Sequence, residues 1–70
     1  MPIPNDAFRR GDVYIDYPFE DVRFRFEKAT GKVYRRFYGC AEDEVRPDSD
    51  LYHQAILSGR EITRDEYDAD

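Results

Sequence analysis

The most restrictive feature of the sequence is the alternation of apolar and polar side chains in two segments, DVYIDY at residues 12–17 and VRFRFEK at residues 22–28. A period of two in segments rich in β-branched and aromatic residues is typical of β-strands that bury one face. Pro18 begins the connection PFED between them. The sequence therefore predicts two neighbouring antiparallel strands. Their shared apolar face consists of Val13, Ile15, Tyr17, Val22, Phe24 and Phe26.

A third strand, VYRRFYG, follows the turn sequence ATGK. If residues 30–31 form a two-residue loop, Phe24 lies opposite Phe37. A longer TGK loop would turn the third strand over and bury Tyr34 and Tyr38 instead. We expect the first register, because it keeps the phenylalanines together on one face.

This register places a basic and aromatic set of side chains on the other face of the sheet. If PFED is a four-residue loop, Asp16 lies opposite Arg23 and Tyr14 opposite Arg25, so much of the positive charge is complemented within the sheet. The remaining like-charge pair is Arg25 beside Arg36, which costs up to about 1 kcal/mol. We name this surface the Arg/Tyr face, and define it by Arg23, Arg25, Glu27, Tyr34, Arg36 and Tyr38.

The second half of the chain predicts two helices. The first runs through LYHQAILS, with an N-cap among residues 48–50 and Gly59 after its last residue. It is too short to be stable alone, so we expect it to pack on the apolar face of the sheet. A capping box of Thr63 and Glu66 predicts a second helix of about one turn. The apolar stripe of the first helix comprises Leu51, Tyr52, Ala55 and Ile56.

Together these elements predict one α+β domain over residues 1–70. It consists of a three-stranded antiparallel β-meander, one helix packed on its apolar face and a short C-terminal helix. The segment AEDEVRPDSD is expected to be an acidic loop. Residues 1–8 are expected to be flexible and residues 68–70 to be frayed. A core this small makes a homodimer an open alternative.

Several classes of function are disfavoured by composition. One cysteine, Cys40, permits no internal disulfide, and nothing in the sequence predicts a metal site or another cofactor. Cys40 and His53 are the residues that suggest nucleophilic catalysis, but their spacing supplies neither an orienting group nor an oxyanion site, so we expect no enzyme. The sequence predicts neither a signal peptide nor a membrane span, which favours a cytoplasmic protein.

Charge is divided unevenly along the chain. Residues 1–39 carry a formal charge of +2 and residues 40–70 carry −7. This asymmetry predicts a non-enzymatic binding protein whose acidic half occupies a basic surface of a protein partner, as an antidote, immunity or inhibitor protein does. Asp68 favours the same hypothesis, because an acid at a helix C-terminus is unfavourable unless a cation lies nearby. The predicted contact residues are Glu42, Asp43, Glu44, Asp48, Asp65, Glu66 and Asp68, with Tyr52 and Tyr67 as aromatic anchors.

Two alternatives remain open. The Arg/Tyr face has the composition of a site for single-stranded nucleic acid, in which tyrosines stack on bases and arginines bind phosphates. Against this, the sequence pI is about 4.7, whereas nucleic-acid-binding domains usually have a pI above about 9. The chain could also be a regulatory module that acts by dimerising. The candidate nucleic-acid-binding residues are Arg23, Arg25, Arg36, Tyr14, Tyr34 and Tyr38.

Overall fold

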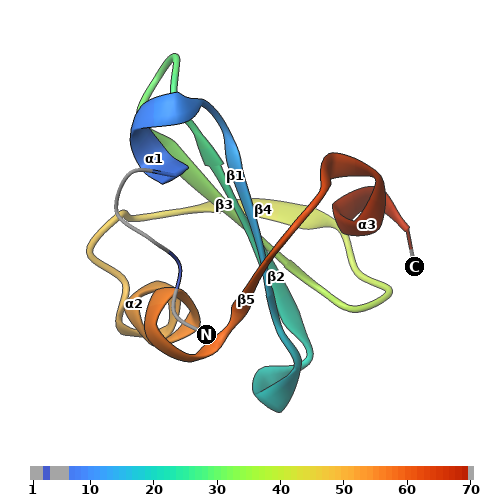
Figure 1. Ribbon diagram of the computed structural model, residues 1–70. Helices are drawn as coiled ribbons and strands as arrows, with labels where there is room; N and C mark the ends of the chain where they lie inside the picture. Colours follow the sequence, from blue (N-terminus) through green and yellow to red (C-terminus); the bar gives the residue numbers. More distant parts are fainter. Residues whose placement is uncertain (1–2, 4–6, 70) are drawn as a thin grey trace.

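The computed structural model describes residues 3 and 7–69 (Figure 1). The elements of this part of the chain are α1 (Ala7–Arg10), β1 (Val13–Tyr17), the 3₁₀ turn η1 (Pro18–Glu20), β2 (Val22–Glu27), β3 (Lys32–Phe37), β4 (Glu42–Val45), α2 (Asp50–Ser58), β5 (Arg60–Ile62) and α3 (Arg64–Asp68). The strands form one antiparallel sheet in the order β4-β3-β2-β1-β5. Figure 1 shows α2 and α3 on opposite sides of this sheet.

The predicted α+β class is confirmed, but the prediction of three strands is wrong, because the described residues form a five-stranded sheet. β4 lies within the segment AEDEVRPDSD that was expected to be an acidic loop, and it pairs with β3 so that Val45 lies opposite Val33. β5 follows Gly59 and pairs with β1, with Ile62 opposite Tyr14. Both added strands are short and polar. Without alternating apolar residues, they give no periodic signal in the sequence.

The register of the central strands is partly as predicted. Asp16 lies opposite Arg23, as expected. β3 is displaced by two residues from its predicted position, so that Arg25 faces Tyr34 and Arg36 faces Arg23. A shift of two residues leaves every side chain on its predicted face. The two faces are therefore correct, while the cross-strand pairs between β2 and β3 are not.

This displacement originates in the turn between β2 and β3, which spans residues 28–31 rather than residues 30–31. The Gly31 N–H donates to the Glu27 carbonyl at 2.8 Å, and the Thr30 hydroxyl donates to Glu27 Oε1 at 2.8 Å. Gly31 has φ of 72°, which favours glycine. The longer turn places Phe24 opposite Arg35 instead of Phe37.

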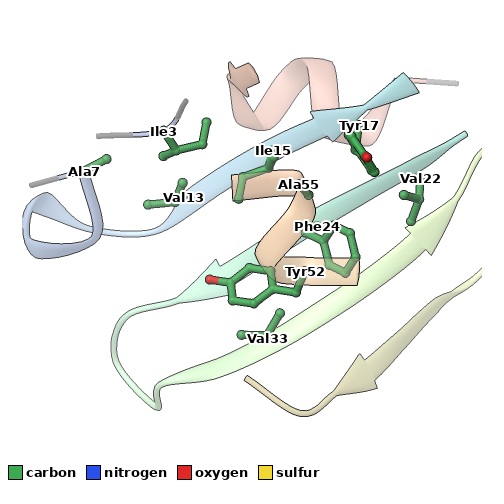
Figure 2. Packing of buried hydrophobic residues seen from close by; sticks show 10 residues of the cluster. All are labelled: Ile3, Ala7, Val13, Ile15, Tyr17, Val22, Phe24, Val33, Tyr52 and Ala55. Carbon is green, nitrogen blue, oxygen red and sulfur yellow. The ribbon is translucent and has the colours of Figure 1, made fainter. Parts of the chain in front are cut away.

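The core lies between the apolar face of the sheet and α2, as predicted. Tyr52 and Ala55 of α2 are buried, and the Tyr52 ring lies 5.5 Å from the Phe24 ring between centroids. Figure 2 shows these two rings side by side, with Ala55 beside Ile15. The residues predicted to complete the helix stripe, Leu51 and Ile56, are partly buried against the same core.

Part of the predicted N-terminal tail is packed against the core. Residues 1–2, 4–6 and 70 lie outside the described residues, so the predicted flexibility there stays a prediction. Ile3 and Ala7 are buried with the core, and the Ile3 N–H donates to the Ile56 carbonyl at 2.9 Å. These two residues of the predicted tail are therefore part of the packed domain.

Position 59 requires glycine because the backbone around it is closely packed, and not because its φ angle is positive. Gly59 follows the last residue of α2, as predicted, and its φ of −82° and ψ of −169° are extended. A Cβ atom at this position would lie 2.6 Å from the Ala55 carbonyl oxygen and 2.7 Å from the Asp16 carbonyl oxygen. The absence of a side chain lets the chain pass from α2 directly into β5 beside β1.

Replacing Gly59 with alanine should therefore lower the free energy of unfolding by about 1–3 kcal/mol, because the methyl group overlaps two backbone oxygens. Urea denaturation measures this loss. Gly11→Ala is the matched control, since a Cβ there meets nothing within 4 Å, and it should change stability by less than about 0.5 kcal/mol. Equal effects of the two substitutions would contradict close packing at Gly59.

Candidate functional site

The centre of the Arg/Tyr face is covered by α3. Tyr67 of α3 is buried, and its ring lies 5.5 Å from the Tyr14 ring between centroids. Arg36 Nη1 donates to the Tyr67 carbonyl at 2.6 Å, and Arg23 Nη1 donates to the Ala69 carbonyl. The last carbonyls of a helix have no partner within the helix. Two arginines of the sheet therefore satisfy the C-terminal end of α3.

This arrangement corrects the interpretation of Asp68. An acid at a helix C-terminus was expected to need a cation from another protein, but Arg23 and Arg36 already supply positive charge to this end of α3. Asp68 Oδ2 also lies 3.9 Å from Arg64 Nε on the same helix. The position of Asp68 is thus explained within the chain.

Glu42 links β4 to the same face. Arg25 Nε donates to Glu42 Oε1 at 2.8 Å, and the Tyr67 hydroxyl donates to the same oxygen at 3.1 Å. The Arg25 guanidinium also donates to Glu27 Oε2 at 3.1 Å and lies 4.1 Å from the centre of the Tyr34 ring. Glu42 was predicted to contact a partner, but its contacts are with the side chains that hold α3 on the sheet.

A second acid, Asp16 of β1, compensates the positive charge of Arg23 and Arg60. It is buried, and its Oδ1 accepts a hydrogen bond of 2.5 Å from the Tyr38 hydroxyl. Arg23 Nε lies 3.7 Å from Oδ1, and Arg60 Nη2 lies 3.6 Å from Oδ2. Burial and the adjacent Asp16 raise the pKa of Tyr38 to about 12. A buried carboxylate is stable here because several donors surround it.

The six residues proposed for nucleic-acid binding are therefore engaged within the chain. Each has a contact described above with a side chain or carbonyl of this chain. Binding of phosphates would have to displace these partners, and α3 lies over the tyrosine and arginine centre of the face. The geometry gives no support to a nucleic-acid site. The residues are Arg23, Arg25, Arg36, Tyr14, Tyr34 and Tyr38.

Most of the predicted acidic contact residues lie at the surface. Three of them form ion pairs with exposed basic side chains. Glu44 Oε1 is 4.0 Å from Lys32 Nζ, and Asp48 Oδ1 is 3.2 Å from Arg46 Nε. The third is Asp68, paired with Arg64. Such exposed pairs are weak, typically below about 1 kcal/mol. They leave these carboxylates accessible to a partner.

The other exposed acids have different environments. Glu66 completes the predicted capping box, with its backbone N–H donating to Thr63 Oγ1 at 3.2 Å. Asp43 projects from β4 on the face of α2, whereas Asp65 lies on α3. Neither aspartate forms an ion pair with any residue the structure describes.

The predicted aromatic anchors require correction. Tyr52 is 5% exposed and lies in the core, and Tyr67 is 3% exposed and lies between α3 and the sheet. Neither ring is therefore accessible to a partner. Their spacing on short helices was consistent with either burial or exposure. Both rings are buried because α2 and α3 pack on opposite faces of the sheet.

A group of exposed aromatic side chains at one end of the sheet was not predicted from the sequence. Phe19 of η1 is 78% exposed, and Phe37 and Tyr38 at the end of β3 are each more than one third exposed. The Tyr38 N–H donates to the Asp21 carbonyl at 2.9 Å, which joins the end of β3 to the turn after η1. We name Phe19, Phe37 and Tyr38 the aromatic end. The available signal was a phenylalanine inside the turn sequence PFED.

Chemical sites are not evident elsewhere in the described residues. Cys40 is exposed after β3, and His53 Nε2 on α2 lies 3.2 Å from the Pro47 carbonyl. Among residues 3 and 7–69, no group of three His, Cys, Asp or Glu residues has the arrangement of a metal site. The helices in that part of the chain are too short and too polar to cross a membrane.

Comparisons with known proteins give a consistent result over nearly the whole chain. A family model described as Tis1 immunity protein matches residues 1–70. The chain is 49% identical over 65 residues to the immune protein Tis1 of Pseudomonas aeruginosa (strain UCBPP-PA14), covering 90% of this chain and 84% of that protein. It is also similar to a chain in the crystal structure of the complex between the Type VI effector Tas1 and its immunity protein. That similarity has a TM-score of 0.87 and 46% identity, and covers 96% of this chain and 91% of the other.

If Glu42 has a structural role, Glu42→Gln should lower the free energy of unfolding by about 1–2 kcal/mol, because charge-assisted hydrogen bonds to Arg25 and Tyr67 are weakened. Glu44→Gln on the same strand is the matched control, and should change it by less than about 0.5 kcal/mol because Glu44 forms only a long, exposed ion pair. Urea denaturation of both variants tests this difference. A larger loss for Glu44→Gln would contradict the assignment.

The buried tyrosines predict a loss of stability at alkaline pH. Burial raises the pKa of Tyr52 to about 12, whereas a tyrosine in the unfolded chain titrates near about 10. Between these values the unfolded chain loses its proton first, so the free energy of unfolding should fall by about 1.4 kcal/mol per pH unit from this residue. Burial and Glu42 also raise the pKa of Tyr67, which adds to the effect.

Denaturation at a series of pH values above about 9 measures this slope. Tyr52→Phe keeps the ring and removes the titrating group, so its stability should fall less steeply with pH than that of the unmodified chain. An identical slope in the variant would show that Tyr52 ionises equally easily in the folded and unfolded states.

Proposed function

The chain belongs to the Tis1 immunity protein family, and from this membership we propose that it binds and neutralises the Type VI effector Tas1. Immunity proteins of this kind are non-enzymatic inhibitors, which confirms the sequence-based hypothesis of an immunity-like binding protein rather than an enzyme. The observation that supports Tas1 as the partner is the close match of fold and sequence to a chain of the solved effector complex.

The distribution of charge supports an acidic contact surface for this partner. The arginines of the Arg/Tyr face are directed at α3, Glu42 and Asp16, so they do not offset the exposed acids at the surface. A net charge of −5 would accelerate encounter with a basic surface and make association sensitive to salt. The acidic contact residues that we retain in this proposal are Asp43, Glu44, Asp48, Asp65, Glu66 and Asp68.

Binding to purified Tas1 tests this proposal, with the association rate and the dissociation constant measured over a series of salt concentrations. We expect tight binding whose association slows as salt rises. Glu44→Lys should slow association by about tenfold at low salt if β4 faces a basic surface of the effector. Its melting temperature should be nearly unchanged, because Glu44 is exposed and weakly paired.

Glu61→Lys is the matched control, since Glu61 is an exposed glutamate on β5 at the opposite edge of the sheet and the change in net charge is the same. Equal slowing by both variants would contradict a contact at β4 and leave only a general effect of charge. Failure of the unmodified chain to bind Tas1 would contradict the proposed function itself.

A further inference from the structure

The aromatic end contains Phe19, the most exposed large apolar side chain among the described residues. The described residues contain four exposed large hydrophobic side chains, and three of them, Phe19, Phe37 and Tyr38, lie at the end of the sheet formed by η1 and the end of β3. Figure 1 shows η1 projecting at the end of the sheet opposite to the turn between β2 and β3. Single exposed apolar residues are common, whereas several of them at one end of a domain make that end a candidate interaction site.

We propose that the aromatic end anchors the effector, with Phe19 inserted into an apolar pocket of Tas1 that is bordered by basic side chains. This inference rests on the proposed function and deepens it by naming the contact that contributes most to affinity. The acids of β4 and α3 would then act mainly in encounter, while the aromatic end would act in holding the complex together.

Phe19 is held in a defined turn, which lowers the entropy lost on binding. Pro18 begins η1, and the Asp21 N–H donates to the Pro18 carbonyl at 3.2 Å. The Asp21 carbonyl in turn accepts from the Tyr38 N–H, so the turn is fixed to β3. The Phe19 ring lies 5.8 Å from the Tyr17 ring between centroids in an edge-to-face contact. A pre-organised aromatic side chain is a favourable binding anchor.

Phe37, the last residue of β3, and Tyr38, which follows the strand, extend this surface around the end of the sheet. Phe37 lies opposite Val22 and on the face of α2, and the Arg35 guanidinium lies 5.2 Å from the centre of its ring. Tyr38 follows it on the opposite face and is fixed through its hydroxyl to Asp16. Both rings are therefore oriented by contacts within the chain, while each residue remains more than one third exposed.

Two carboxylates determine which occupant suits this surface. Glu20 and Asp21 directly follow Phe19 in the chain and both are exposed. Neither forms an ion pair with another residue in the part of the chain that the structure describes. A second copy of this chain docked here would bring two such acidic pairs together, which is unfavourable. An apolar pocket with lysines or arginines at its border complements both the ring and the charges.

Phe19→Ala tests the proposal in binding experiments with purified Tas1. We expect the dissociation constant to rise by at least about tenfold, mainly through faster dissociation, as for a central aromatic anchor. Leu57→Ala is the matched control, because Leu57 is 68% exposed on α2 and is not one of the residues of the aromatic end. It should change the dissociation constant by less than about twofold. The melting temperature of each variant should stay close to that of the unmodified chain.

The outcomes separate this inference from the proposed function. If the unmodified chain binds Tas1 and Phe19→Ala binds equally well, the aromatic end is not the anchor, while the proposed function stands. If Leu57→Ala loses as much affinity as Phe19→Ala, the effect is not specific to this surface and the inference is wrong. If light scattering shows a homodimer that Phe19→Ala dissociates, the occupant is a second copy and the assignment to the effector is overturned.

A variant that lacks the two negative charges beside Phe19 tests the basic border of the pocket independently. Glu20→Gln combined with Asp21→Asn removes both carboxylates, and asparagine tolerates the left-handed conformation of residue 21, whose φ is 52°. Association with Tas1 should slow by several-fold and become less sensitive to salt. An unchanged association rate would contradict a basic border around the pocket.

Discussion

Arginine side chains from the central strands bind the carbonyl end of the last helix, and the other features of the Arg/Tyr face depend on this contact. Arg23 and Arg36 donate to the Ala69 and Tyr67 carbonyls. They satisfy acceptors that the helix itself leaves unpaired, and they place positive charge at the negative end of its dipole. A helix of five residues would not be stable alone. Its capping box at one end and these arginines at the other hold it on the sheet.

This contact also explains how an acidic chain accommodates a basic sheet face. Glu42 and Asp16 accept hydrogen bonds from Arg25 and Tyr38, so the positive charges are compensated within the domain. Other carboxylates remain exposed, among them those on β4, on α3 and beside Phe19. The internal pairing therefore decides which charges a partner meets, and it makes the outer surface more acidic than the sequence of the sheet suggests.

Sequence patterns predicted the parts of the fold that rest on periodicity and capping. The alternation at Phe24 and Phe26 defined the apolar face, and Thr63 with Glu66 defined the start of α3. The edge strands were missed because their four and three residues carry no apolar alternation. The register of β3 was wrong because turn length depends on hydrogen bonds around Thr30 that composition does not specify.

The candidate site was harder to predict for a related reason. The immunity-like function followed from charge asymmetry, but the roles of single residues depend on which side chain packs against which. Glu42 and Glu44 are two residues apart in an acidic run, yet one holds α3 in place and the other forms a weak surface pair. Phe19 was overlooked because a turn residue belongs to neither periodic strand, so its exposure emerged only from the structure.

Amide hydrogen exchange on the isolated chain shows whether the arginines hold α3 on the sheet in solution. The Tyr67 N–H donates to the Thr63 carbonyl, and the Ala69 N–H donates to the Asp65 carbonyl, so both amides report whether α3 is docked. Both amides should exchange more slowly than in the unfolded chain, and Arg36→Gln should accelerate their exchange. Exchange at the unfolded rate until Tas1 is added would contradict this expectation, because the arginine face would then be uncovered in the isolated protein.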